Sequence, residues 1–158
     1  MKKHLLTILI ILGLVGFYFY RYKRAPDLSF SDVVLVNENE VKTSITDELG
    51  EHSVIHFYAS WCGPCLKELS HFQKNAAALQ ELGITYIFIT DDSEEKVLRM
   101  KENMPEFVKF FRINSLKEAG IYTLPTSYFL AGTEVVDKQV EAFDWSNLEE
   151  LKRKTLIQ

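Results

Sequence analysis

The chain opens with one long apolar run and then alternates short apolar stretches with amphipathic ones. Leu5 to Tyr20 contains no charged residue, and an apolar run with basic flanks favours a membrane span. At about 1.5 Å per residue the run covers roughly 24 Å, a little less than a hydrocarbon core of about 30 Å. The flanking Lys3 and Arg21 would therefore have to extend to the interface at each end.

The end of this run distinguishes an anchor from a cleaved leader. Phe17 to Tyr20 form an aromatic belt closed by a basic cluster, whereas a secretory signal ends in small residues. Cleavage stays an alternative, and a buried soluble helix fits poorly because the run has no polar stripe. We expect residues 1–24 to be a membrane anchor, 25–27 a linker, and 28–158 the folded domain.

The folded part begins with a predicted hairpin, followed by a strand, a helix and a strand. Residues 33–36 and 40–44 flank an Asn-rich turn, which predicts a hairpin. Residues 53–59 and 84–90 are apolar on both faces, as buried parallel strands are. Between them a helical pattern runs from Pro64 to Leu79, and Gly83 follows as a stop. A strand–helix–strand unit requires a parallel pair with a right-handed crossover.

The remaining elements complete one α/β domain. Residues 91–103 read as a helix whose acidic start is better explained by the helix dipole than by a metal site. Ser146 is predicted to cap a last helix that ends near Lys154. The other predicted elements are a strand near 107–111, a short helix at 115–119, and a hairpin of 126–130 and 134–140.

Charge separates the two parts of the chain. The net charge is -4, but five basic residues precede Asp27, leaving 13 of the 18 basic residues against all 22 acidic ones in the folded part. Nucleic-acid binding needs a basic face. The acidic domain therefore argues against a nucleic-acid partner.

Cys62 and Cys65 are the only cysteines, and they form a Cys-x-x-Cys pair where the first core strand gives way to a helix. The N-H groups and dipole at a helix N-terminus favour a thiolate at Cys62, while Cys65 is expected to be more enclosed. Structural zinc needs four ligands, so a redox role is favoured over metal binding. A copper-carrying dithiol assisted by His56 stays an alternative.

The segment Phe57 to Cys65, with Glu68 one turn later and Leu124-Pro125-Thr126 before the next strand, resembles the thioredoxin superfamily. Within it, the chain is similar to the membrane-tethered bacterial thiol-disulfide oxidoreductases of cytochrome c maturation, the TlpA/ResA-like proteins. The resemblance implies a thioredoxin-like fold for residues 28–158, with a central mixed β-sheet flanked by helices and preceded by one transmembrane helix. It implies no cofactor other than the Cys62–Cys65 dithiol and disulfide.

The same resemblance assigns supporting roles. Pro125 would be a cis-proline packed against the dithiol, and the backbone of Leu124 would pair with an extended substrate. Glu68 would tune the thiols, the alternative being a solvated acid beside Lys67. The remaining supporting residues are Trp61, Gly63 and Pro64, with Trp61 either a wall of the site or part of the core.

His56 departs from the family pattern, since thioredoxin itself has a buried aspartate six residues before its first cysteine. A histidine beneath Cys65 could take its proton during resolution of a mixed disulfide. The alternative is a neutral strand histidine satisfied by backbone groups. The sequence leaves both open.

The resemblance implies a membrane-tethered enzyme with its catalytic domain on the periplasmic side of a single-pass anchor. Its partners would be thiols and disulfides of envelope proteins, such as apocytochrome c, and a membrane-embedded electron carrier of the disulfide-reductase type. The Gly63-Pro64 pair resembles that of reducing thioredoxins, which favours a reductase. A disulfide oxidase or isomerase is the main alternative.

Overall fold

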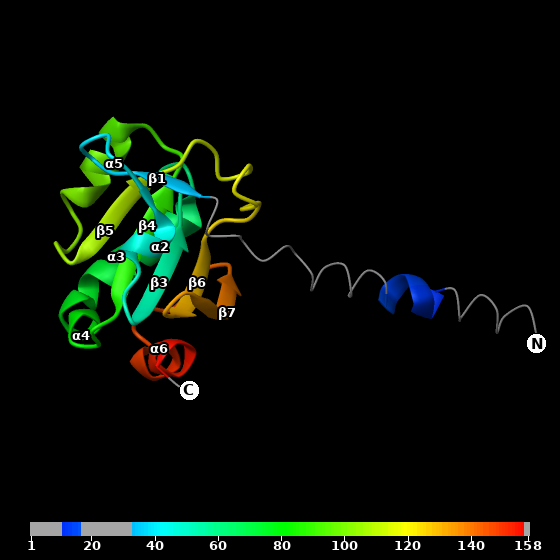
Figure 1. Ribbon diagram of the computed structural model, residues 1–158. Coiled ribbons are helices and arrows are strands. Elements are labelled where there is room, and N and C mark those ends of the chain that lie inside the picture. The colour runs from blue at the N-terminus through cyan, green and yellow to red at the C-terminus, as the bar shows by residue number, and fades with distance from the viewer. Residues whose placement is uncertain (1–10, 17–32, 157–158) are drawn as a thin grey trace, which may run out of the picture.

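A seven-stranded mixed sheet organises the computed structural model, which describes residues 11–16 and 33–156 (Figure 1). The strands lie in the order β2-β1-β5-β4-β3-β6-β7. β3 pairs in parallel with β4, and β4 with β5, whereas β6 lies antiparallel to β3. The strands are β1 (Val34–Val36), β2 (Lys42–Ser44), β3 (His52–Phe57), β4 (Thr85–Thr90), β5 (Val108–Arg112), β6 (Thr126–Ala131) and β7 (Glu134–Val140).

The predicted strand–helix–strand unit is confirmed, with one interruption in its helix. The sequence predicts a continuous helix to Leu79, but it breaks at Asn75, whose side-chain amide donates to the His71 carbonyl at 2.8 Å. Gly83 then adopts φ +66°, a conformation that glycine tolerates without strain. The helices are α2 (Ile45–Glu48), α3 (Gly63–Lys74), α4 (Ala76–Gln80), α5 (Glu94–Lys101) and α6 (Leu148–Thr155).

Two apolar cores lie on opposite faces of the sheet because successive side chains of a strand point to opposite sides. Val54 on β3 and Tyr58 just after it belong to the cluster that contains both cysteines and residues of α3, α4, α5 and α6. Ile55 and Phe57 belong to the other cluster, which is covered by α2 and the loop after β5. His56 is two residues from both Val54 and Tyr58, so its side chain lies on the same face of the sheet and points toward α3.

Three local predictions are wrong. Residues 115–119 form a turn, although Ala119 N–H still donates to the Ser115 carbonyl at 3.1 Å. The last helix is capped by Asn147, whose side chain accepts from Glu150 N–H, because Ser146 is bound to Asp144 instead. The helix predicted over 91–103 is shorter, spanning Glu94–Lys101 with Glu94 and Glu95 as the acidic residues of its first turn.

The membrane anchor falls almost wholly outside the described residues. Residues 11–16 of the predicted span are helical, with exposed apolar side chains, while residues 1–10, the rest of the span and the linker at 25–27 are not described. In the described segments, 11–16 and 33–156, no helix is both long and apolar enough to cross a bilayer.

Candidate active site

The two cysteines meet where β3 ends and α3 begins. Cys62 and Cys65 are joined in a disulfide, with their Cα atoms 5.2 Å apart. Cys62 is the N-cap residue of α3, and Pro64 lies in the first turn, where its missing N–H leaves no bond unmade. Cys65 faces the core and is fully buried, whereas Cys62 is 5% exposed.

The backbone around Cys62 suits a sulfur that carries negative charge. Its Sγ lies 3.2 Å from the Cys65 N–H, which donates to it. The position at the start of α3 adds the positive end of the helix dipole. Cys65 is fully buried instead, and burial disfavours a thiolate. These contacts support the predicted asymmetry between the cysteines.

In the reduced protein we expect Cys62 to react with iodoacetamide faster than Cys65, and to stay reactive at lower pH. The reason is that the thiolate is the nucleophile and only Cys62 combines a helix N-terminus with access to solvent. Timed alkylation between pH 5 and 9, followed by mass spectrometry of the two cysteine sites, measures both rates. Equal rates throughout this range would leave no ground for separate roles.

A cleft opens over Cys62 between the motif and the loop before β6. Trp61, Cys62 and Leu124 line it together with Tyr122. The Leu124-Pro125 peptide bond is cis, as the resemblance implies. Trp61 is 72% exposed, which makes it a wall of the cleft and excludes the alternative of a core residue. Tyr122 lies outside the motifs that the sequence shows.

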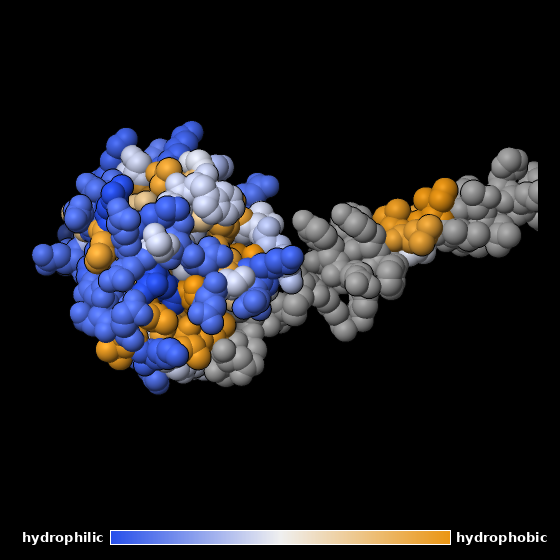
Figure 2. Space-filling view, turned by 90° about the horizontal axis from the view of Figure 1, so that it is seen from above, coloured by the Kyte–Doolittle hydropathy of each residue, from blue (hydrophilic) through white to orange (hydrophobic). Residues whose placement is uncertain are grey.

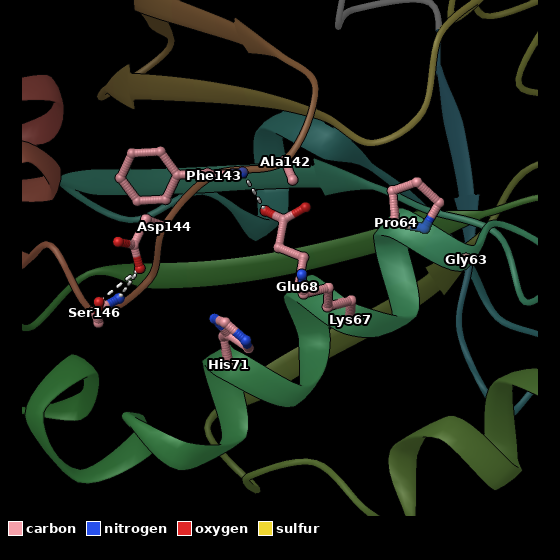
Figure 3. Close-up of a pocket in the computed structure, with 9 residues that line it drawn as sticks. All are labelled: Gly63, Pro64, Lys67, Glu68, His71, Ala142, Phe143, Asp144 and Ser146. Carbon is pink, nitrogen blue, oxygen red and sulfur yellow. Dashed lines mark hydrogen bonds between the residues drawn. The ribbon is translucent and has the colours of Figure 1, made fainter.

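Glu68 is a buried acid. Its side chain lies between α3 and the segment after β7, where Oε1 accepts from the Phe143 N–H at 3.1 Å (Figure 3). The same oxygen accepts from Trp145 Nε1 at 2.8 Å. Burial raises the pKa of Glu68 to about 7, although these two hydrogen bonds oppose the shift. Glu68 is only 3% exposed, so the alternative of a solvated acid beside Lys67 is wrong.

His56 lies on β3 beneath this carboxyl group. Its Nδ1 is 2.9 Å from Ser127 Oγ on β6 and 3.9 Å from Glu68 Oε1. The ring is fully buried among aromatic side chains, including Phe88 at 5.0 Å between ring centroids, and burial lowers the pKa of His56 to about 3. The side chain is therefore neutral, as one of the two alternatives has it, but its partner is the Ser127 hydroxyl and not a backbone group.

Two buried atoms of this pair remain unsatisfied. Within the described part of the chain, His56 Nε2 and Glu68 Oε2 have no hydrogen-bond partner. Neutral polar atoms tolerate burial better than charged ones, which is consistent with the direction of both pKa shifts. The structure thus places a neutral imidazole on β3 next to a readily protonated carboxyl group on the buried face of α3, the helix that carries the cysteines.

Asp92 holds the turn that precedes the motif. Its carboxylate accepts from the Ser60 N–H at 2.6 Å, from Ser60 Oγ at 2.9 Å and from Thr90 Oγ1 at 3.1 Å. These bonds lower the pKa of Asp92 despite the opposing effect of burial. The carboxylate therefore stays ionised and ties the end of β4 to the loop that presents Trp61.

The structure divides the predicted residues into two groups. Trp61, Gly63, Pro64 and Leu124 line the cleft beside Cys62. Glu68 and His56 lie together inside the domain, joined to Ser127 and Trp145, which the sequence did not indicate. Of these two, only Ser127 has a sequence signal, because it is a polar residue within an otherwise largely apolar strand.

Sequence comparisons give relatives with related chemistry. The sporulation thiol-disulfide oxidoreductase A of Bacillus subtilis (strain 168) is 26% identical over 152 residues, which cover 87% of this chain and 89% of that protein. The thiol-disulfide oxidoreductase ResA of Bacillus thuringiensis subsp. konkukian is 24% identical over 142 residues, with 79% and 78% covered.

Solved structures share the fold. StoA from Bacillus subtilis aligns with a TM-score of 0.53 and 25% identity, over 74% of this chain and 92% of that one. A thioredoxin-like protein from Porphyromonas gingivalis aligns with a TM-score of 0.63 and 18% identity, over 80% and 89%. Residues 22–115 match the model of the AhpC/TSA family. With its disulfide at the start of α3, the chain belongs to the AhpC/TSA family of thioredoxin-like proteins and is a thiol-disulfide oxidoreductase.

Proposed function

We propose that this protein is a membrane-tethered reductase of disulfides in envelope proteins. The observation that carries the chemistry is the unequal placement of the two sulfurs, with Cys62 at a helix N-terminus beside a cleft and Cys65 enclosed behind it. A nucleophile must reach its substrate, whereas a resolving thiol only needs to reach the first sulfur. This arrangement supports attack by Cys62 on any protein disulfide that fits the cleft.

The reaction follows from this placement. The Cys62 thiolate attacks one substrate sulfur, a mixed disulfide forms, and the other substrate sulfur leaves as a thiolate that takes up a proton. Cys65 then loses its proton and attacks Cys62 Sγ, which expels the second substrate sulfur. The substrate gains two electrons and the enzyme becomes the Cys62–Cys65 disulfide, which is the form of the present structure.

Resolution needs an acceptor for the Cys65 proton. Glu68 lies one turn after Cys65 on the same buried face of α3, and a carboxyl group with a pKa of about 7 can accept a proton at neutral pH. His56, with a pKa of about 3, is a weak base under the same conditions. We therefore propose Glu68 as the acceptor and His56 as the residue that holds its surroundings neutral.

The direction of the reaction is open to measurement. We expect the dithiol, equilibrated with glutathione, to have a reduction potential nearer the thioredoxin value of about -270 mV than the oxidant value of about -120 mV. The reason is the likeness of Cys62-Gly63-Pro64-Cys65 to reducing members of the superfamily. A potential near the oxidising end would favour a disulfide oxidase or isomerase instead. Tight copper retention by the reduced protein without disulfide reduction would favour the copper-carrying alternative.

The N-terminal apolar run determines where the protein is proposed to act in the cell. We expect the full chain to remain in the membrane fraction after a carbonate wash, and protease added from the periplasmic side to digest the domain. The support is the apolar run of residues 5–20 with its basic flanks. A soluble mature form beginning near residue 17 or 25 would indicate a cleaved leader.

A reductase of this kind needs an electron donor and protein substrates. A membrane-embedded electron carrier of the disulfide-reductase type would return Cys62 and Cys65 to the dithiol form, and envelope disulfides, including those of cytochrome c maturation, would be substrates. Figure 2 shows a domain face covered mainly by hydrophilic side chains with small apolar patches between them. Such a surface suits transient encounters better than a permanent complex.

A further inference from the structure

Trp61 and Tyr122 are the only aromatic side chains that are exposed in the described segments. They are 72% and 75% exposed, whereas the other described aromatic rings are buried or half-buried. Neither ring contacts another aromatic ring, and neither side chain forms a hydrogen bond, within those segments. Large aromatic side chains left in water are enriched where proteins bind partners. The exposure of these two rings therefore indicates a binding surface.

Both rings border the cleft over Cys62 but come from different parts of the chain. Trp61 precedes α3, whereas Tyr122 lies in the loop before β6, two residues ahead of Leu124. Ile121 and Leu124 add apolar surface to the same cleft. A side chain that enters here beside a substrate cysteine would meet apolar surface from both segments.

Two charged residues also line the cleft. The Asp91 carboxylate already accepts from the Leu116 N–H at 3.1 Å, while Lys117 has no ion-pair partner among the described residues. Asp91 and Lys117 carry opposite charges, so together they favour neither a cation nor an anion in the cleft. Aromatic faces can bind cations as well as apolar groups, but an apolar side chain gains contact with both rings and with Ile121 and Leu124 without giving up the hydration of a charge.

We propose that Tyr122 is a specificity-determining residue, which together with Trp61 binds a bulky apolar side chain next to the substrate's cysteine. This inference rests on the proposed function and names its substrate class: extended polypeptides whose cysteine is followed by a residue such as leucine or phenylalanine. Leu124 and the cis Pro125 lie on the same loop, so a substrate backbone that runs along this loop carries its side chain past Tyr122.

The test uses the full, reduced protein and symmetric peptide disulfides that differ only in the residue after cysteine, which is leucine, serine or lysine. We expect kcat/KM for the leucine peptide to exceed that for serine by about tenfold, as burial of an apolar side chain predicts. In Tyr122→Ser the ratio should fall to about twofold or less, and in Tyr122→Phe it should persist, because the ring provides the contact.

Two controls separate specificity from chemistry. The reduction of 2-hydroxyethyl disulfide, which has no side chain to bind, should fall by a smaller factor in Tyr122→Ser than the reduction of the leucine peptide does. Leu98→Ser, which removes an exposed apolar side chain on α5, should leave the leucine preference intact. A preference for lysine, or a leucine preference that survives in Tyr122→Ser, would overturn this proposal alone. If the wild-type protein reduces none of the three peptide disulfides, the proposed function fails and the inference fails with it.

Discussion

Replacing Cys62 with alanine should lower the rate of disulfide reduction by at least about a thousandfold, since no other thiol in the chain reaches the cleft. Replacing Cys65 should stop turnover at a different stage. In Cys65→Ala the Cys62 thiolate still attacks the substrate, but nothing resolves the mixed disulfide that forms. Non-reducing gels after exposure to an envelope extract should therefore show covalent adducts for Cys65→Ala and none for Cys62→Ala.

The two variants serve as matched controls for each other. Each lacks the Cys62–Cys65 disulfide, so any loss of stability from that crosslink is common to both. A difference in adduct formation then reports the separate roles of the sulfurs. Adducts that form equally through Cys65 in the Cys62→Ala variant would reverse the assignment of nucleophile and resolving thiol.

The sequence predicted the parts of the site that are close together in the chain. Cys62, Cys65 and the helix that begins between them follow from one local motif, and the cis bond before Pro125 was implied by the resemblance to the thioredoxin superfamily. The parallel pairing of β3 with β4 was predictable for the same reason, because apolar runs and crossover handedness depend on neighbouring segments.

The interior of the site depends on contacts between distant residues. Glu68 and Trp145 are 77 positions apart, yet their hydrogen bond decides whether Glu68 is solvated or buried. Ser127 is 71 positions from His56, and only the pairing of β3 with β6 brings them together. A sequence pattern gives the helix face on which Glu68 lies but not the segment that covers that face. The burial of Glu68 therefore could not be read from the sequence.

That burial has a measurable consequence for stability. The pKa of Glu68 is raised from its ordinary value of 4.5 to about 7. Between these pH values the native protein binds more protons at Glu68 than the unfolded chain does. The contribution of Glu68 to the free energy of unfolding therefore falls as pH rises, by up to about 1.4 kcal/mol per pH unit.

His56 contributes with the opposite sign. Its pKa is lowered from the ordinary value of 6.5 to about 3, so between these values the unfolded chain binds more protons than the native protein. The free energy of unfolding then rises with pH, with the same limiting slope. Between about pH 4.5 and 6.5 both effects operate, and in the wild-type protein they largely cancel.

Single substitutions should uncover the two slopes. In Glu68→Gln, whose amide oxygen can still accept from Phe143 and Trp145, we expect stability to rise with pH from 4.5 to 6.5, because only the His56 contribution remains. In His56→Asn, which can still bond Ser127, we expect stability to fall over the same range. Urea unfolding of the oxidised protein at half-unit pH intervals measures both slopes.

The opposite signs make this comparison decisive, because a general loss of packing would lower stability without reversing its dependence on pH. Glu118→Gln, at an exposed position in the turn after β5, serves as the control for removing one acid and should keep the wild-type profile. If both Glu68→Gln and His56→Asn also kept that profile, neither buried group would change its protonation on unfolding in this range. Glu68 would then not be poised to accept the Cys65 proton at neutral pH. Slopes of opposite sign would instead show that burial raises the proton affinity of Glu68 and lowers that of His56, so that the Glu68 carboxylate is the better acceptor for the Cys65 proton at neutral pH.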